Sequence, residues 1–173
     1  MTTKIAIVGP ESTGKSTLTK ALSNEWNATV VTEYARQYLA DHDGKYSESD
    51  LIEIAKGQLA LEERALEGHP KILICDTNLM EIEVWGYFKF NRIDILIQKM
   101  SSMTLYDIHL LTYPDLPWEN DPLRETPDHL TELFEVYLQF LEQRKLPFRI
   151  IKGTGDARLH NTLKALREFG IRG

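Results

Sequence analysis

One short stretch near the beginning of the chain limits most strongly what this sequence can fold into. Residues 4–8 (KIAIV) form an apolar run, and residues 9–16 (GPESTGKS) follow it and match the pattern G-x-x-x-x-G-K-[ST] in full. The next residues, 16–26, have helical spacing, with Leu18 and Leu22 on one face. A buried strand, a glycine-containing turn and an amphipathic helix in this order predict an α/β fold whose turn lies at the carboxyl end of a strand.

The chemistry of this turn is that of a phosphate-binding loop. Gly9 and Gly14 let the backbone turn tightly and approach a phosphate, and the N–H groups of the loop and of the helix N-terminus point at the anion. Lys15 is expected to reach the outer phosphates, and the Ser16 hydroxyl is expected to bind Mg²⁺, with Thr17 as the alternative hydroxyl. The residues predicted to bind the nucleotide are Gly9, Glu11, Ser12, Thr13, Gly14, Lys15, Ser16 and Thr17.

Apolar segments alternate with helical patterns along the rest of the chain. Further strands are predicted over residues 28–32, 71–75, 108–112 and 148–151, and further helices over residues 48–67, 79–90, 94–100, 126–141 and 156–169. This alternation predicts a five-stranded parallel sheet with helices on both faces, which is the α/β fold of P-loop NTPases, in a single domain over residues 1–173. Residues 113–125 contain three prolines and are predicted to form a lid loop.

Composition narrows the class of protein further. The chain has 173 residues, about one domain by length, and 20 Lys and Arg against 26 Asp and Glu give a net charge of −6. This acidic balance argues against a nucleic-acid-binding protein, and no apolar run approaches the roughly 18 residues that span a bilayer. A single cysteine, Cys75, excludes an internal disulfide, and the N-terminus lacks the pattern of a signal peptide, so we expect a cytoplasmic protein. The histidines have no metal-ligand spacing, so no zinc site is predicted.

Asp76 directly follows the apolar run of residues 71–75, at the carboxyl end of a predicted buried strand. Because the strand ends of a parallel sheet share one edge, this carboxylate is expected beside the phosphate loop, where it would hold Mg²⁺ directly or through water. The alternative is that Asp76 caps the following helix. Cys75, inside the same run, is predicted to be a core residue.

Absent motifs narrow the class of nucleotide-binding protein. The sequence has no Asn-Lys-x-Asp motif, no Asp-x-x-Gly after the second acid and no Leu-Ser-Gly-Gly-Gln signature, which argues against switch GTPases and transport ATPases. The chain is also too short for the helical lid domain of a ring-forming ATPase. A small-molecule kinase remains, and it needs a base for the acceptor hydroxyl, a substrate pocket and a lid that carries cations.

Glu33 follows the second predicted strand and is therefore expected near the transferred phosphoryl group. It is the candidate to position or deprotonate the acceptor hydroxyl, with Asp76 as the rival base. Arg36 either contacts a phosphate or pairs with Glu33. Arg124, at the end of the predicted lid, would come onto the γ-phosphate. The predicted catalytic residues are Lys15, Glu33, Asp76 and Arg124, and the predicted metal ligands are Ser16 and Asp76.

Trp85 lies in the predicted helix over residues 79–90, together with Tyr87 and Phe88. An aromatic side chain beside a strand-end acid suits a flat ring, and in particular a cationic one. Tyr87 and Phe88 are instead predicted to pack in the core. After the last predicted strand, residues 152–155 (KGTG) lie where an adenine would rest against the backbone.

Several of these motifs together resemble one protein family. They are GPESTGKST at residues 9–17, TEYAR at 32–36, DTN at 76–78 with Trp85 after it, and YDIHLLTYPDLPWENDPLRE at 106–125. They resemble the ribosylnicotinamide kinase domain of NadR-type proteins, which is grouped with the AAA-like NTPase and kinase domains of NAD metabolism. The resemblance covers nearly the whole chain.

The resemblance implies ATP- and Mg²⁺-dependent phosphorylation of the 5′-hydroxyl of nicotinamide riboside, which gives nicotinamide mononucleotide. It adds Asn78 to the expected substrate contacts, and the family's W-x-x-D-x-x-R pattern adds Trp118 and Asp121. Trp85 or Trp118 would stack on the ring of the acceptor. The predicted substrate-binding residues are Glu33, Arg36, Asn78, Trp85, Trp118 and Asp121.

The chain has no room for the nucleotidyltransferase and DNA-binding helix-turn-helix domains of the multifunctional members. We therefore expect a stand-alone kinase module that takes a small-molecule nucleoside. Two alternatives stay open: a kinase for another nucleoside or small alcohol, and a non-enzymatic ATP-binding sensor. Consumption of ATP that a nucleoside stimulates would separate an enzyme from a sensor.

Overall fold

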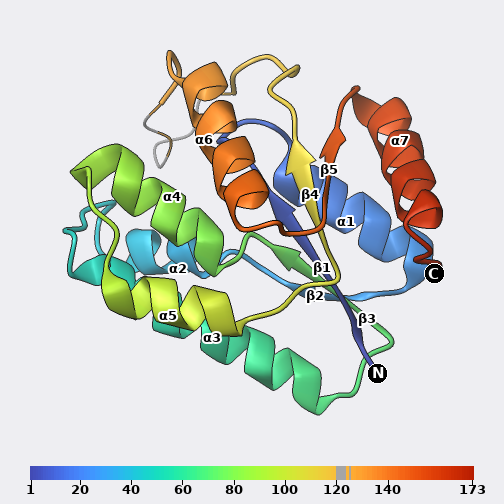
Figure 1. Cartoon of the computed structure of the whole chain (residues 1–173), viewed down its shortest axis with the longest axis horizontal. Helices are drawn as coiled ribbons and strands as arrows, with labels where there is room; N and C mark the ends of the chain where they lie inside the picture. Colours follow the sequence, from blue (N-terminus) through green and yellow to red (C-terminus); the bar gives the residue numbers. More distant parts are fainter. Residues whose placement is uncertain (120–123, 125) are drawn as a thin grey trace.

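Strands and helices alternate along most of the chain (Figure 1). The structure is a computed structural model that describes residues 1–119, 124 and 126–173. In chain order the elements are β1 (Thr3–Val8), α1 (Lys15–Trp26), β2 (Thr29–Val31), α2 (Tyr34–Asp41), α3 (Asp50–Glu67), β3 (Ile72–Asp76), α4 (Leu79–Phe90), α5 (Ile95–Met103), β4 (Ile108–Thr112), α6 (Leu130–Gln143), β5 (Phe148–Ile151) and α7 (Gly155–Glu168). None of the helices in the described part of the chain combines the length and the apolar character needed to cross a membrane.

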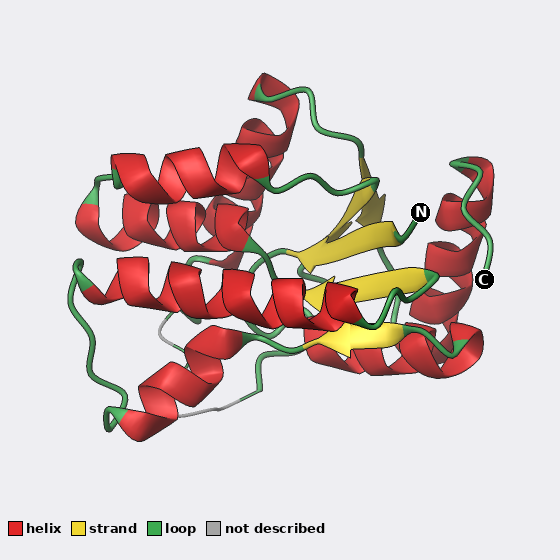
Figure 2. Ribbon diagram, turned by 90° about the horizontal axis from the view of Figure 1, so that it is seen from below, coloured by secondary structure: helices red, strands yellow, loops and turns green. Residues whose placement is uncertain are grey.

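The strands form a sheet with helices around it (Figure 2), and β1 lies at the centre of the strand order. Over the described residues the strand order is β2-β3-β1-β4-β5, and every neighbouring pair is parallel. Ile5 of β1 is in register with Ile74 of β3 on one side and with Ile108 of β4 on the other. Residues 5–8 of β1 have no exposed surface. The five-stranded parallel sheet predicted from the alternating pattern is confirmed.

Successive residues of β1 face opposite sides of the sheet and meet different helices. Ile5 and Ile7 pack in one cluster with apolar residues of α1 and α7. Ala6 and Val8 pack in another cluster with residues of α4 and α6. The two pairs of helices therefore cover opposite faces of the sheet (Figure 1). Burial on both faces explains why the inner strands β1, β3 and β4 are mainly apolar, and the fully buried Cys75 of β3 is a core residue as predicted.

The strand order brings three connections to one edge of the sheet. β3 lies between β1 and β2, so the carboxyl ends of these strands are neighbours although they are far apart in the sequence. The phosphate loop follows β1, α2 follows β2 and α4 follows β3. Ligands of open parallel sheets bind at this edge, which places the candidate site among these three connections.

α2 has no counterpart among the predicted elements. It is short and none of its residues is fully buried, although Tyr34, Ala35 and Tyr38 pack, partly buried, against a cluster that includes residues of α3. Its first residue is held from outside, because the Tyr34 N–H donates over 2.9 Å to Oε1 of Gln58, a buried residue of α3. A tertiary contact rather than the local pattern thus fixes where this helix begins.

Two predictions of local structure are wrong. The predicted helix start at Thr126 fails because α6 begins only at Leu130. The N–H and the hydroxyl of Thr126 instead donate to Oε2 of Glu11, over 3.2 and 2.9 Å, so this side chain is turned towards the phosphate loop. The prediction that Tyr87 is a core residue fails because 45% of Tyr87 is exposed. Phe88 does pack, half-buried, against the cluster between the sheet and α6.

Candidate active site

The loop between β1 and α1 is a backbone cradle shaped by two glycines. Gly9 has a φ of +139°, and a Cβ there would come within 2.5 Å of Thr112 Oγ1 and 2.9 Å of its carbonyl oxygen. Gly14, the N-cap of α1, is left-handed with a φ of +75°. The Thr13 hydroxyl closes the loop from inside by donating to the Pro10 carbonyl over 2.7 Å. A left-handed residue at the start of a helix is typical of the N–H cradles that bind phosphate.

Lys15, the lysine of the loop motif, is held inside the site. Its Nζ donates to the carbonyl oxygens of Gly9 (2.7 Å) and Pro10 (3.0 Å) and forms an ion pair with Glu81 Oε1 at 3.3 Å. Burial disfavours the Lys15 ammonium, but the carboxylates of Glu81 and Glu33 outweigh burial and raise its pKa. Lys15 is therefore a positioned, charged ammonium beside the cradle.

Asp76 ends β3, one residue beyond the predicted strand, and only 5% of it is exposed. Its Oδ1 atom is buried without a hydrogen-bond partner among the described residues. Burial raises the pKa of Asp76, while a hydrogen bond from Ser16 and the charge of Lys15 oppose that shift. A buried, unpartnered carboxylate oxygen beside a serine hydroxyl is a donor set that suits a hard divalent cation such as Mg²⁺.

Glu33 and Arg36 lie at the beginning of α2 and pair with each other. Glu33 is the N-cap residue of the helix, and Arg36 Nε donates to its Oε2 over 3.1 Å. Burial raises the pKa of Glu33, although the charges of Lys15 and Arg36 act in the opposite direction. A partly buried carboxyl group whose pKa is raised, close to the phosphate loop, has the character of a proton acceptor.

A cavity of about 470 Å³ joins the phosphate loop to α2, α4, α6 and the beginning of α7. The sequence-predicted residues on its wall outside the loop are Glu33, Arg36, Trp85 and Arg124. The Trp85 indole is held in place by Tyr46, since Trp85 Nε1 donates to Tyr46 Oη over 2.5 Å. The structure thus brings together residues from widely separated segments around one space that a small molecule can fill.

Glu81 on α4 and Tyr137 on α6 also line this cavity, and neither was singled out from the sequence. Burial raises the pKa of Glu81 to about 8, with the charge of Glu33 adding to the shift and that of Lys15 opposing it. Burial also raises the pKa of the Tyr137 phenol, and the charge of Glu81 adds to it. The sequence does contain a pattern that could have pointed to Glu81. Glu81 and Glu83 are acids inside the otherwise apolar start of a helix, where a charged side chain needs a partner.

Three predicted substrate contacts are not on the described wall of the cavity. Asn78 is 2% exposed and caps α4, because its Oδ1 accepts the Glu81 N–H over 3.3 Å. It lines a separate cavity beside α5, so its amide is used for capping and not for the phosphate-loop cavity. Trp118 is half-buried and outside the described lining, and Asp121 lies outside the described residues.

Arg124 reaches the phosphate loop from the segment after β4. Its Nη1 donates to Ser12 Oγ over 3.2 Å and to the Glu119 carbonyl over 2.7 Å. Ser12 Oγ also accepts the Glu119 N–H over 2.8 Å, and Glu11 accepts two hydrogen bonds from Thr126. The side chains of Glu11 and Ser12, both predicted to bind nucleotide, therefore hold this segment against the loop.

Proteins of known sequence that resemble this chain include two NadR proteins. The chain is 28% identical over 174 residues to the trifunctional NAD biosynthesis/regulator protein NadR of Escherichia coli (strain K12). It is 31% identical over 174 residues to the NadR protein of Salmonella typhimurium (strain LT2). Each alignment covers 95% of this chain but 42% of the relative, so the chain spans less than half the length of these proteins.

Solved structures share the fold. A NadR protein in complex with NAD and AMP-PNP has a TM-score of 0.83 at 22% identity, over 99% of this chain and 51% of the other. A NadR protein in complex with NR has a TM-score of 0.80 at 22% identity, over 99% and 52%. A deoxyadenosine kinase of M. mycoides with bound dATP has a TM-score of 0.66 at 16% identity, over 95% and 99%. These likenesses confirm the predicted P-loop fold of the nucleoside-kinase type.

The family assignment rests on a family model that matches most of the chain. A family model described as an AAA domain matches residues 4–158, which include the phosphate loop, the strand-end acids and the start of α7. The resemblance to NadR-type proteins expected from the motifs is confirmed by the two relatives. The chain is therefore a member of the AAA-domain family, built on a P-loop α/β fold and related to NadR.

Proposed function

We propose that this protein is an ATP-dependent nucleoside kinase that phosphorylates the 5′-hydroxyl of nicotinamide riboside and gives nicotinamide mononucleotide. One observation carries the proposal: the phosphate loop, Glu33 and Trp85 line the same cavity of about 470 Å³. A donor nucleotide and an acceptor nucleoside would therefore meet in one space. The likeness to NadR proteins that were solved with AMP-PNP and with NR supports both partners.

We assign the whole reaction to one domain over residues 1–173, with separate roles for the residues around the cavity. Glu33 takes the proton of the 5′-hydroxyl as that oxygen attacks the γ-phosphorus, and the bond from this phosphorus to the bridging oxygen breaks so that ADP leaves. Lys15 and Arg124 balance the charge on the transferred group. Asp76 is the rival base, but its position beside Ser16 favours a role in metal binding.

Ser16 and Asp76 are the residues that would hold Mg²⁺. The fit rests on the unpartnered Asp76 Oδ1 and on the adjacent Ser16 hydroxyl, which are hard oxygen donors. When bound, the ion neutralises phosphate oxygens of the nucleotide. The remaining loop residues bind the phosphates through the backbone N–H groups of the cradle.

The acceptor end of the cavity suits a flat ring that carries positive charge. Trp85 offers an aromatic face that Tyr46 holds in place. Glu33 adds a carboxylate to the same wall and pairs with Arg36, whereas the Glu81 carboxyl group, whose pKa is raised to about 8, lies beside Lys15. An aromatic face near carboxylates attracts a pyridinium ring more strongly than a neutral base of the same shape.

A panel of acceptors tests the proposal. The protein is incubated with ATP, Mg²⁺ and nicotinamide riboside, other nucleosides or small alcohols, and the phosphorylated product is identified by chromatography and ³¹P NMR. We expect the highest kcat/KM with nicotinamide riboside, and loss of product with Lys15→Ala. If phosphate is transferred only to another nucleoside, that nucleoside replaces nicotinamide riboside as the proposed acceptor. A protein that binds ATP but never consumes it in response to any acceptor would be a sensor and not a kinase.

A further inference from the structure

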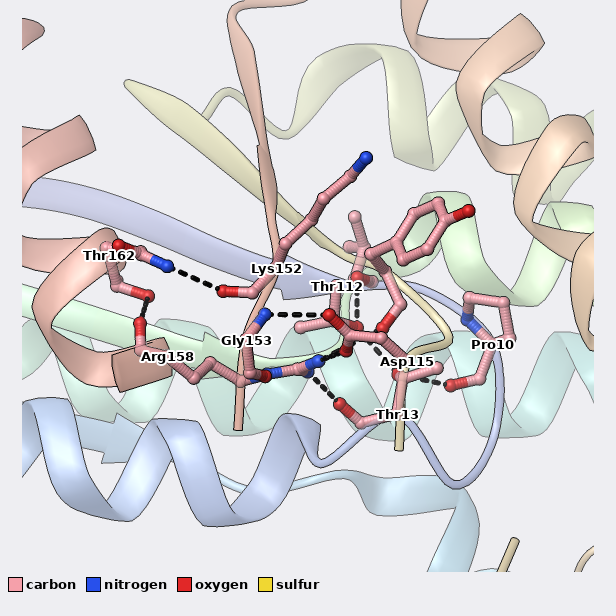
Figure 3. A network of polar contacts seen from close by, with 11 residues as sticks. Pro10, Thr13, Thr112, Asp115, Lys152, Gly153, Arg158 and Thr162 are labelled. Carbon is pink, nitrogen blue, oxygen red and sulfur yellow. Dashed lines mark hydrogen bonds and ion pairs between the residues drawn. The ribbon is translucent and has the colours of Figure 1, made fainter. Parts of the chain in front are cut away.

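Arg158, in the first turn of α7, is a buried arginine at the point where three segments meet. Only 4% of it is exposed. Its guanidinium donates to the carbonyl oxygens of Gly153 (from Nε, 2.5 Å), Tyr113 (from Nη2, 3.1 Å) and Thr13 (from Nη1). It also forms an ion pair with the Asp115 carboxylate (Figure 3). One side chain thus joins the phosphate loop to the segments that follow β4 and β5.

Asp115 closes this network into a ring. Its Oδ1 pairs with Arg158, and its Oδ2 accepts the Gly153 N–H over 2.7 Å (Figure 3). The turn after β5 is held a second time, because Asn161 Nδ2 donates to the Lys152 carbonyl over 3.0 Å. Gly153 has a φ of +102°, and a Cβ there would come within 3.2 Å of Asn161 Nδ2. Arg158 is therefore tied to a well-fixed support at one end and to the phosphate loop at the other.

The contact with Thr13 bears directly on the phosphate cradle. The Thr13 carbonyl and the Gly14 N–H belong to the same peptide group, and in a trans peptide these two bonds point in opposite directions. When Arg158 holds the carbonyl oxygen, the N–H must therefore point to the other side. Gly14 has no Cβ and a φ of +75°, so without this contact the peptide plane would rotate at little steric cost.

The guanidinium is suited to this task in a way that an ammonium is not. It carries five N–H donors in a rigid plane, whereas lysine carries three donors around one nitrogen atom and cannot span partners from three segments. Arg158 lines the same cavity as Gly14, Lys15 and Thr17. Burial works against its charge, and the nearby Asp115 carboxylate compensates for part of that cost.

We propose that Arg158 is a positioning residue for the donor nucleotide: by holding the Thr13 carbonyl, with Asp115 as counter-ion, it aims the Gly14 N–H at the phosphates. The inference rests on the proposed function only in naming ATP as the nucleotide. Arg158 then governs binding of the donor and not the chemical step, since its partners are backbone carbonyls and one carboxylate rather than reacting atoms.

The test compares Arg158→Lys with Arg144→Lys. Arg144 is a matched control, because it donates two hydrogen bonds of 2.7 Å to the fully buried carboxylate of Glu83 and does not line the phosphate-loop cavity in the described chain. The Kd for ATP and Mg²⁺ is measured by calorimetry without an acceptor. We expect Arg158→Lys to raise this Kd about 10-fold or more, the size of a lost charged hydrogen bond, with the acceptor KM unchanged. Arg144→Lys should lower the melting temperature and leave the Kd for ATP unchanged.

Two further readouts separate positioning from simple destabilisation. The backbone amide signal of Gly14 in a ¹⁵N NMR spectrum should move when ATP is added to the wild type and stay in place in Arg158→Lys. Asp115→Asn keeps the shape of the side chain and removes its charge, so it should raise the Kd for ATP by a smaller factor of about three.

The outcomes distinguish this inference from the proposed function. If Arg158→Lys binds ATP as tightly as the wild type, or if Arg144→Lys weakens ATP binding equally, the positioning role is overturned. If Arg158→Lys does not fold, Asp115→Asn decides, and an unchanged Kd for ATP there overturns the role. If nicotinamide riboside is not phosphorylated while Arg158→Lys still loses ATP affinity, the acceptor assignment fails and the positioning role stands.

Discussion

The two halves of the cavity are built in opposite ways. The phosphate cradle of the donor half is one continuous segment, residues 9–17, made of backbone groups and shaped by two glycines. The acceptor half is made of side chains from three helices: Glu33 at the start of α2, Glu81 on α4 and Tyr137 on α6. The donor half can therefore be recognised from a local pattern, whereas the acceptor half exists only after the sheet has brought distant segments together.

This difference also determines how each half responds to substitution. A change in the donor half alters contacts with phosphate and leaves the packing of the helices as it was. A change beneath α2, which has no fully buried residue, moves acceptor residues and leaves the cradle untouched. Separate measurements of kcat and of KM for donor and acceptor test this division directly.

The largest effect is expected from Lys15→Ala in the donor half. Its Nζ contacts two loop carbonyls and Glu81 rather than the core, so the fold should survive, as far-UV circular dichroism would show. Loss of the ammonium should lower kcat about 100- to 1,000-fold, because a fixed charge at the transferred phosphoryl group is removed. Near-normal turnover in this variant would contradict the assigned role of the loop.

In the acceptor half, Glu33→Gln should lower kcat about 100-fold, because the variant cannot take the hydroxyl proton, while the KM for ATP stays unchanged. Asp76→Asn is the comparison, and it should raise the Mg²⁺ concentration that gives half-maximal activity. Steady-state rates over a Mg²⁺ titration check both variants. If Asp76→Asn is inactive at every Mg²⁺ concentration and Glu33→Gln is active, Asp76 and not Glu33 is the base for the acceptor hydroxyl.

Gly57→Ala should disturb the acceptor half without touching any residue of the site. A Cβ at Gly57 of α3 would overlap the ring of Tyr34, the first residue of α2. The free energy of unfolding should fall by about 1–3 kcal/mol, and the acceptor KM should rise while the ATP KM does not. Chemical unfolding and steady-state kinetics measure the two effects.

Gly68→Ala is the control for that experiment. Gly68 ends α3 in the right-handed conformation with a φ of −73°, and a Cβ there would have its nearest neighbour at 3.6 Å. Its stability should stay within about 0.5 kcal/mol of the wild type. An equal rise of the ATP and acceptor KM values in Gly57→Ala would show that the two halves are not independent.

The last prediction concerns the pH dependence of stability at Glu81. Its pKa is about 8 in the folded protein against an ordinary 4.5, so the folded state binds this proton more tightly than the unfolded chain does. The stability that this group contributes is complete below about pH 4.5 and is lost as the pH rises towards 8. Glu81→Gln should therefore flatten the decline in unfolding free energy over that range in urea titrations. Equal slopes in both proteins would show that the Glu81 carboxyl does not hold its proton in the folded state.

The sheet and the phosphate loop could be predicted because both depend on local patterns. Strands buried on both faces are continuous apolar runs, and the loop has its residues in one segment. The first residue of α2 could not be predicted, because the side chain of Gln58 from another helix holds its N–H. Thr126 has the chemistry of a helix cap, but Glu11 accepts its hydroxyl hydrogen bond, a contact between residues 115 positions apart.

The contacts of the site residues also depend on the fold and not on the local sequence. Glu81 and Glu83 are two acids in one apolar helix, and only the register of α4 against the sheet decides that Glu81 pairs with Lys15 and Glu83 with Arg144. Asn78 matches the motif of a family, and in the fold its side-chain oxygen also caps α4. A sequence pattern identifies the chemistry of a side chain, but the fold determines which residue that side chain contacts.

The absence of fully buried residues in α2 has a consequence for motion. β1 is paired on both sides and has no exposed surface over residues 5–8, so its amide hydrogens should exchange with solvent only when the whole domain unfolds. The amides of α2 should exchange through local opening, at a much smaller free energy. If the amides of α2 exchange faster than those of β1, the helix that begins next to Glu33 opens while the sheet stays folded. Such opening would give a nucleoside a path into the cavity beside a bound nucleotide.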